Sequence, residues 1–178
     1  PQMEIENGVL ITYIPDDNQK SATIPEGVTH IGDEAFYKCT SLTSITLPKG
    51  LTSIGDEVFS FCTNLTSINL PEGLTSIGWG AFSDCRSLTS INLPKGLTSI
   101  GWRAFSDCRS LTSITIPEGV TSIGAETFFN CGSLTSINLP NSLTSIGERA
   151  FPGNEITSIT IPEKVTSIGD FAFCNCWS

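Results

Sequence analysis

Hydrophobic and polar positions alternate along this chain in short segments that return at a regular interval. In residues 65–70, the apolar Ile68 and Leu70 alternate with the polar Ser67 and Asn69. This period of two is typical of a strand with one buried and one wet face. A second apolar run follows at residues 74–77. The pattern therefore predicts two extended segments in each unit and no long helix.

The residues between the two segments indicate how each unit turns. Pro71 ends the first strand because proline has no N–H for the ladder, and the Glu-Gly or Lys-Gly pair after it is expected to form a corner. Gly78 is predicted to permit a backbone turn that a side chain would hinder. The A-F-x-x-C stretch that completes the unit is predicted to be one helical or 3₁₀ turn.

This unit repeats along almost the whole chain. Prolines recur every 23 residues, with one last interval of 22, at Pro25, Pro48, Pro71, Pro94, Pro117, Pro140 and Pro162. Phenylalanines follow the same period at Phe36, Phe59, Phe82, Phe105, Phe128, Phe151 and Phe173. Because one unit cannot bury its own apolar side, the units must stack and share a core. The phenylalanines are predicted to point into that core.

The frame I-P-x-G-V-T-x-I-G-x-x-A-F-x-x-C resembles the BspA-like leucine-rich repeats, which are common in surface proteins of bacteria and of some protist parasites. Two departures are Asn154 at a cysteine position and the end at Ser178 without an obvious cap. The predicted fold is a mainly β repeat solenoid, a right-handed leucine-rich-repeat stack with one parallel sheet, a second short extended face and short helical or 3₁₀ turns. Residues 1–18 are expected to form an amino-terminal half-repeat or cap, and residues 19–178 about seven repeats in one continuous domain.

Charge and motifs exclude several classes of function. The net charge of −9 argues against nucleic acid and anionic membranes as partners, and no apolar run is long enough for membrane insertion. The only histidine, His30, stands at a position that holds Ser53 and Ser76 in other repeats. No nucleotide-binding, metalloprotease or hydrolase motif is present. We therefore expect a non-enzymatic protein without a cofactor or a bound metal, and a solvated acidic rim rather than a calcium site near the amino end.

Stacking turns each repeat position into a column, and two columns are interpreted as structural. The corner residues alternate in charge and are expected to form a solvated ladder that holds the register: Glu26, Lys49, Glu72, Lys95 and Glu118. The cysteine column is expected to consist of buried thiols, because the count of seven is odd and parallel side chains suit disulfides poorly: Cys39, Cys62, Cys85, Cys108 and Cys131. Cys174 and Cys176, near the end, are expected to be more prone to oxidation.

Two other columns are candidates for partner binding. Trp79 and Trp102 occupy a position where other repeats carry acidic residues or alanine, so both are predicted to be exposed, near Arg86, Arg103 and Arg109. Duplication of one accidental tryptophan is the alternative. The first strands are predicted to present a flat polar surface that includes Asn69, Asn92, Thr115 and Asn138. A plain solvated strand face is the alternative there.

The resemblance implies a cell-surface or secreted recognition module, adhesin-like, that binds a protein or a glycan through the long sheet and the Trp/Arg patch. A structural spacer without a ligand is the second hypothesis, and an ice-binding surface is a distant third because the rows mix Ser, Asn and Thr. The final coil, near Phe173 and Trp177, has no polar cap. Self-association through that coil, or continuation of the native chain, is therefore expected.

Overall fold

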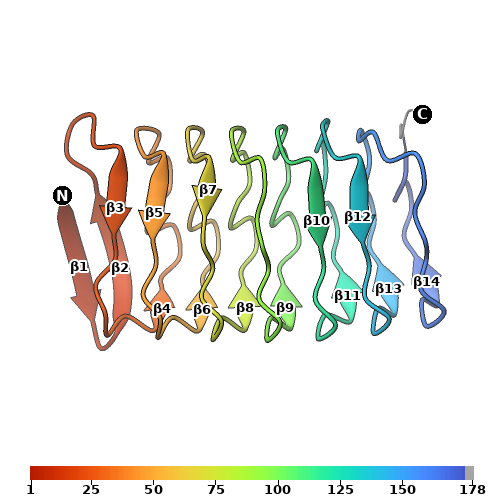
Figure 1. Ribbon diagram of the computed structural model, residues 1–178, viewed down its shortest axis with the longest axis horizontal. Helices are drawn as coiled ribbons and strands as arrows, with labels where there is room; N and C mark the ends of the chain where they lie inside the picture. The colour runs from red at the N-terminus through yellow and green to blue at the C-terminus, as the bar shows by residue number, and fades with distance from the viewer. Residues whose placement is uncertain (175–178) are drawn as a thin grey trace.

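The computed structural model describes residues 1–174 and forms a solenoid in which one coil follows another along a single axis (Figure 1). Each coil runs through two extended segments and one turn segment before it passes to the next coil. The repeat solenoid and its parallel stacking, predicted from the sequence, are confirmed. The boundary drawn at residue 18 stays a prediction.

The first extended segments form one face, here called the Asn/Thr face. Its strands are β3 (Ser21–Thr23), β5 (Ser44–Thr46), β7 (Ser67–Ile68), β10 (Ser113–Thr115) and β12 (Ser136–Asn138). Neighbouring strands pair in parallel with a register of one repeat, as in Ser44 opposite Ser67. The isoleucines of these strands are buried, and the serines and threonines beside them are exposed.

The second extended segments form another face, here called the Ser/Gly face. Its strands are β4 (His30–Ile31), β6 (Ser53–Ile54), β8 (Ser76–Ile77), β9 (Ser99–Ile100), β11 (Ser122–Ile123), β13 (Ser145–Ile146) and β14 (Ser167–Ile168). An antiparallel hairpin of β1 (Gln2–Glu6) and β2 (Val9–Ile14) begins the chain, and β2 pairs in parallel with β4. The hairpin thus extends this face at its amino-terminal end (Figure 1).

The sheets differ in one respect from the predicted single sheet with a second extended face. Both faces form parallel sheets, and each face is interrupted once, into six and three strands on the Ser/Gly face and into three and two on the Asn/Thr face. Both faces can pair because both segments carry the same Ser-Ile alternation, which matches the copy one coil away. Because the strands are only two or three residues long, each pair of strands shares few hydrogen bonds. One coil that does not pair with its neighbour is therefore enough to interrupt the sheet.

The turn segment contains no helical or 3₁₀ turn within the described residues, so that prediction is wrong. Its N–H groups bond alternately within the coil and to the next coil: Cys62 N–H donates to the Phe59 carbonyl at 3.0 Å, and Phe59 N–H donates to the Ala81 carbonyl at 2.8 Å. Glu57 and Phe61 adopt left-handed φ angles of 52° and 59°, which interrupt any helical run. The turn segments therefore make a third ladder between coils.

The phenylalanine column forms the core, as predicted. Phe36, Phe59, Phe82, Phe105, Phe128 and Phe151 have no exposed surface, and the centroids of consecutive rings lie 5.2–5.6 Å apart. Tyr13 begins the column, with its ring centroid 4.6 Å from that of Phe36. Each coil thus covers the aromatic ring of the coil before it.

The cysteine column is also buried and free of disulfides over the described residues, which confirms the prediction for Cys39, Cys62, Cys85, Cys108 and Cys131. Each thiol points to a backbone carbonyl of the preceding coil, as when Cys85 Sγ donates to the Phe59 oxygen at 3.1 Å. Burial raises the pKa of the Cys62 and Cys131 thiols to about 12. Cys174 is half-buried, and Cys176 and Trp177 lie outside the described residues.

The buried Asn154 stands in for a cysteine in the shortened coil and satisfies its own polar atoms locally. Its Nδ2 donates to the Phe151 carbonyl, and its Oδ1 accepts a hydrogen bond from Ile156 N–H at 3.2 Å. The Asn154 amide therefore closes the turn by hydrogen bonds within its own coil. The cysteine thiols of the other coils bond instead to the preceding coil.

Glycine recurs at the repeat position of Gly78 for a different reason than the predicted backbone turn. Gly78 has no positive φ, but a Cβ at this position would lie 2.5 Å from the carbonyl carbon and oxygen of Gly55. The same close approach of backbones recurs at Gly101, where a Cβ would lie 2.4 Å from Trp79 N. Glycine is required here because the coils come too close for any side chain.

Candidate functional site

The tryptophan pair lies just after strands β8 and β9, at the edge of the Ser/Gly face. Trp102 is 51 % exposed, as predicted, whereas Trp79 is only half-buried rather than fully exposed, so that part of the prediction is wrong. The two rings meet edge to face, with centroids 5.1 Å apart and an interplanar angle of 73°. Trp102 covers part of Trp79, which explains the difference.

The polar residues of the preceding coils position the Trp79 backbone. Asp33 Oδ1 accepts a hydrogen bond from Asp56 N–H at 2.8 Å, and Asp56 Oδ1 accepts one from Trp79 N–H at 2.9 Å. The tryptophans therefore follow directly on an aspartate ladder in the same column. An aspartate at position 79 would continue this ladder by one step.

A shallow trough lies beside the two tryptophans on the Ser/Gly face. It measures about 480 Å³, and its lining includes Ser53, Ser76, Ser99, Asp56, Trp79 and Trp102. The serines come from the consecutive strands β6, β8 and β9, so their side chains form a row. The trough thus offers a row of hydroxyl groups beside indole rings.

A smaller slot opens on the other side of Trp79, at Gly80. The equivalent column holds long side chains in other coils, all with left-handed φ angles: Glu34, Glu57, Arg103, Glu126 and Arg149. Gly80 has a φ of 58° and no side chain, which leaves a slot of about 100 Å³. The slot is lined by Glu57, Ser60, Phe61, Trp79, Gly80, Ser83, Asp84 and Arg103.

The charged groups of the slot are mostly paired within the protein. Arg103 Nε lies 3.4 Å from Glu126 Oε2, and Arg86 Nη2 lies 3.2 Å from Asp84 Oδ1. Partial burial raises the pKa of Glu57, and the Glu34 carboxyl raises it further, both by a hydrogen bond and by like charge. The slot is therefore polar without a strong excess of either charge.

Two side chains that line the slot each carry a buried donor without a hydrogen-bond partner among the described residues. The two donors are the indole Nε1 of Trp79 and the Nε of Arg103, which has only its longer ion pair with Glu126. Buried donors are normally satisfied, and an unsatisfied one costs about 1–3 kcal/mol. Both unsatisfied donors belong to side chains that line the slot, and an acceptor that reached them would offset this cost.

Two more aromatic side chains continue this surface toward the amino terminus. Tyr37 is 38 % exposed and meets Phe61 edge to face, with ring centroids 6.0 Å apart. Lys38 Nζ lies 5.2 Å from the Tyr37 centroid and 5.8 Å from that of Phe61. We call Tyr37, Phe61, Trp79 and Trp102 the aromatic band, with the slot at its centre, because Phe61 and Trp79 both line that slot.

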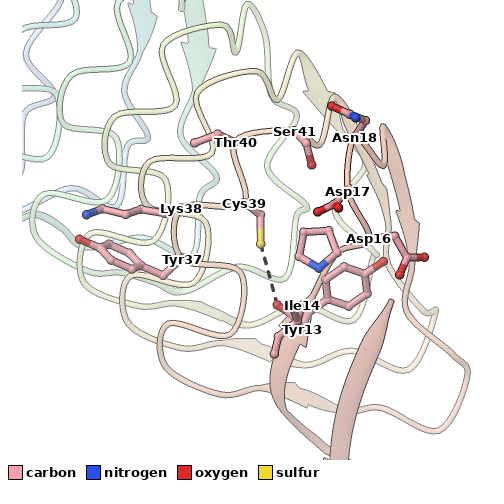
Figure 2. Close-up of a pocket in the computed structure, with 11 residues that line it drawn as sticks. Tyr13, Ile14, Asp16, Asp17, Asn18, Tyr37, Lys38, Cys39, Thr40 and Ser41 are labelled. Atoms are coloured by element: carbon pink, nitrogen blue, oxygen red, sulfur yellow. Dashed lines mark hydrogen bonds between the residues drawn. The ribbon is translucent and has the colours of Figure 1, made fainter.

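An open hollow of about 370 Å³ lies at the amino-terminal end of the band. Figure 2 shows Tyr37 and Lys38 side by side at one edge of it and Asp16 and Asn18 at the opposite edge. Asp16 pairs with the amino terminus at 2.7 Å, and the Tyr13 hydroxyl accepts a hydrogen bond from Gln19 Nε2 at 2.6 Å. Because these polar groups already have partners within the protein, they offer a ligand less than the unsatisfied donors of the slot do.

The predicted arginines divide between two environments. Arg103 lines the slot together with Trp79. Arg86 pairs instead with Asp84, and Arg109 Nη2 lies 3.8 Å from Asp107 Oδ1, each with the carboxylate two residues earlier. Of the three, Arg103 is therefore the one that the structure places with the indole ring of Trp79 around a shared hollow.

The predicted polar rows lie on the Asn/Thr face, apart from the aromatic band. Their members are all exposed, as predicted: Asn69, Asn92, Thr115 and Asn138. Asn92, Thr115 and Asn138 line a shallow depression of about 270 Å³, and Asn138 Nδ2 donates to Thr115 Oγ1 at 3.1 Å. The polar rows and the tryptophans therefore lie on different faces of the solenoid.

The column of corner charges carries no candidate site in the described part of the chain. None of its ion pairs joins neighbours among Glu26, Lys49, Glu72, Lys95 and Glu118, so the corner charges are solvated rather than paired. Over residues 1–174 no three His, Cys, Asp or Glu side chains converge as metal ligands would, and no helix is long and apolar enough to cross a bilayer.

The sequence did not single out the slot, Phe61 or Tyr37. A signal was nevertheless present, because Gly80 is the one glycine in a column of charged and aromatic residues. The position of Phe61 was harder to find, because it stands one residue away from Tyr37 in the repeat. Only the coil geometry brings those two rings together.

Comparison with known proteins agrees with this architecture. The family model for the BspA type leucine rich repeat region matches residues 13–131 and 100–178, with six copies. A leucine rich cell surface protein from Faecalibacterium prausnitzii has 35 % identity and a TM-score of 0.90 over 99 % of this chain. The leucine rich repeat protein of T. pallidum has 31 % identity and a TM-score of 0.84, over 94 % of this chain and 82 % of that one.

The chain spans 52 % of the Faecalibacterium protein, about half of its length. No curated protein matches the sequence. The family match covers nearly all of the chain, and the structural likeness extends over the same residues at more than 30 % identity. This chain belongs to the BspA-type leucine-rich repeat family.

Proposed function

We propose that this chain is a non-enzymatic recognition module of a cell-surface or secreted protein, which binds a glycan or protein partner through the aromatic band. The observation that carries the proposal is the band itself. It exposes tyrosine and tryptophan rings beside hydroxyl, carboxyl and guanidinium groups. Concave sites with aromatic walls and a few polar groups are typical of ligand binding.

The position of the band supports this proposal. The four rings of the band lie within residues 37–102, whereas the matching positions of later coils hold residues such as Ala125 and Glu148. Large exposed aromatic rings do not contribute to the core, and tryptophan, tyrosine and arginine dominate binding hot spots. A local departure from a uniform repeat is what a binding site requires. The surface location of the Faecalibacterium relative supports placement outside the cell.

A structural spacer is the second candidate, and the Asn/Thr face favours it. Its exposed rows repeat the same small polar residues from coil to coil, and its depressions are shallow. Such a surface suits solubility and rigid extension. A spacer gives no reason for the unsatisfied donors of Trp79 and Arg103, so recognition through the band explains more of the structure.

The test is a binding screen of the purified chain against a panel of glycans and matrix proteins. The double variant Trp79→Asp, Trp102→Asp removes both indoles, and the aspartate ladder of Asp33 and Asp56 shows that the backbone accepts this residue. The matched control is Asn92→Asp, Asn138→Asp on the Asn/Thr face. We expect the first variant to fold and to lose binding, while the control keeps it. Equal binding by both variants would refute the band as the site.

A further inference from the structure

The slot at Gly80 has a chemistry that narrows the class of ligand. We propose that it accepts the acetamido group of an N-acetylated amino sugar, which rests on the proposed recognition function and specifies its ligand. The slot is small, about 100 Å³, so it suits one compact substituent rather than a whole sugar ring. The sugar ring itself would lie outside, against the exposed rings of the band.

The unsatisfied donors define the first half of the match. Trp79 Nε1 and Arg103 Nε are buried without a hydrogen-bond partner among the described residues, and both side chains line the slot. Two donors call for an oxygen acceptor and disfavour a cation. The acetamido carbonyl supplies such an acceptor and carries no charge that would have to be desolvated.

The acceptors and the walls define the second half. Asp84 and Glu57 line the slot with carboxyl oxygens, and the hydroxyl of Ser83 already donates to Asp84 Oδ2 at 3.2 Å. The amide N–H of the ligand can donate to one of these oxygens. Trp79 and Phe61 provide aromatic surface for the methyl group. One acetamido group can therefore match all three features: its carbonyl oxygen accepts from the donors, its N–H donates to a carboxyl oxygen, and its methyl group packs against the apolar walls.

The charge balance argues for a neutral group. Arg103 is paired with Glu126 and Asp84 with Arg86, at 3.4 Å and 3.2 Å. A carboxylate ligand would meet Glu57 and Asp84, and the chain as a whole carries a net charge of −9. An ammonium ligand would meet Arg103 and the free indole N–H. An uncharged amide avoids both conflicts.

The flanking rings favour a sugar over a protein side chain. Trp102 is half exposed beside the slot, and the trough next to it carries the row of Ser53, Ser76 and Ser99. Sugar rings offer apolar C–H faces for aromatic stacking and hydroxyls for hydrogen bonds. A row of serine hydroxyls next to an indole fits that combination. A glutamine or acetyl-lysine from a protein would use the slot but leave this row unused.

Calorimetric titration tests the proposal with two probes that differ only in the substituent. These are the β-1,4 trisaccharides of N-acetylglucosamine and of glucose, with an N-acetylgalactosamine oligosaccharide and an acetyl-lysine peptide beside them. We expect an acetylated sugar to bind at least about tenfold more tightly than the glucose trimer, because hydrogen bonds and methyl contact are lost in the latter. Equal affinity for the acetylated and glucose trimers, or preference for the peptide, would overturn the proposal.

Variants separate the slot from the rest of the band. Gly80→Gln fills the slot at a φ that the column already tolerates in Glu57 and Arg103. The nearest atom to the new Cβ would be Cγ of the flexible Glu57 side chain, at 3.2 Å, and Ser83 Cβ would lie in ordinary contact at 3.9 Å. The matched control is Gly132→Gln, where nothing lies within 4 Å. We expect Gly80→Gln to abolish binding and Gly132→Gln to keep it. Trp79→Phe keeps the ring without the donor and should weaken binding about tenfold.

These outcomes also distinguish this inference from the proposed function. If a ligand of the chain is lost in the Trp79→Asp, Trp102→Asp variant but is bound normally by Gly80→Gln, the band is the site and the slot is not. If acetylated sugars bind the double tryptophan variant as well as the original chain, both proposals fail.

Discussion

A side chain in the glycine column should force two coils apart. In Gly101→Ala the new Cβ would lie 2.4 Å from Trp79 N, 2.5 Å from Gly78 C and 2.7 Å from Trp79 Cα. Ordinary contacts between carbon atoms fall near ~3.5–4.0 Å, so the overlap is about 1 Å. All three contacts are backbone atoms, which no side-chain rotation can move. The coils must therefore separate locally.

The cost of this separation can be estimated from its parts. Overpacking of a well-packed site costs about 1–3 kcal/mol. The shift would also stretch the hydrogen bond from Gly101 N–H to the Ile77 carbonyl, now 2.8 Å, and each such bond contributes ~1 kcal/mol. We expect Gly101→Ala to lower the free energy of unfolding by about 2–4 kcal/mol in total.

Two alanine variants serve as controls in the same urea titration, followed by circular dichroism. Gly132→Ala has nothing within 4 Å and an ordinary φ, so it should change stability by less than ~1 kcal/mol, in the favourable direction. Gly124→Ala occupies the same column as Gly101, but its nearest atom is Trp102 Cβ at 3.1 Å, so its effect should be intermediate. Equal midpoints for Gly101→Ala and Gly132→Ala would refute the explanation by close approach.

Four further predictions follow from the core, the thiols and the exposed surface. Phe105→Ala removes a ring with no exposed surface and should lower stability by about 3–5 kcal/mol in thermal unfolding; almost no loss would contradict its inward position. The folded-state pKa of about 12 for Cys62 and Cys131 exceeds the ordinary thiol value of 9.0, so the folded chain keeps protons that the unfolded chain releases. Stability should therefore fall as pH rises from 9 toward 12, by up to ~1.4 kcal/mol per pH unit for each thiol. A flat profile in denaturant titrations over this range would be inconsistent with buried thiols. The raised pKa of Glu57 means that its ionised form is disfavoured in the fold, so Glu57→Gln should raise the melting temperature at pH 7. At a pH below the usual carboxyl pKa range the substitution should have no such effect, and Glu72→Gln, at an exposed position, is the control. The exposed Ile168 and Phe171 of the last described coil should promote self-association. Sedimentation velocity at high concentration should therefore show less dimer for Phe171→Lys than for the original chain. A purely monomeric original chain would rule out self-association through these side chains.

The repeat period by itself determined the architecture. A column of phenylalanines with a 23-residue spacing has one efficient solution, in which every ring covers the ring of the next coil, because no unit can bury its apolar side alone. Burial of the cysteines could be predicted in the same way, since equivalent residues in stacked repeats have the same surroundings. The exposure of the Asn/Thr rows also followed, from the two-residue period of their strands.

The tertiary structure decided what depends on distances between coils. Gly78 reads as a turn residue in the sequence, but its role comes from the backbone of Gly55, one coil away. The turn segment reads as helical, yet left-handed residues such as Glu57 and Phe61 turn its N–H groups toward the next coil. The candidate site has the same origin: Gly80 is unremarkable in its own repeat and becomes a slot only because Glu57, Trp79 and Arg103, from three consecutive coils, surround it. Periodicity fixes what every coil shares, whereas a binding site arises where neighbouring coils differ.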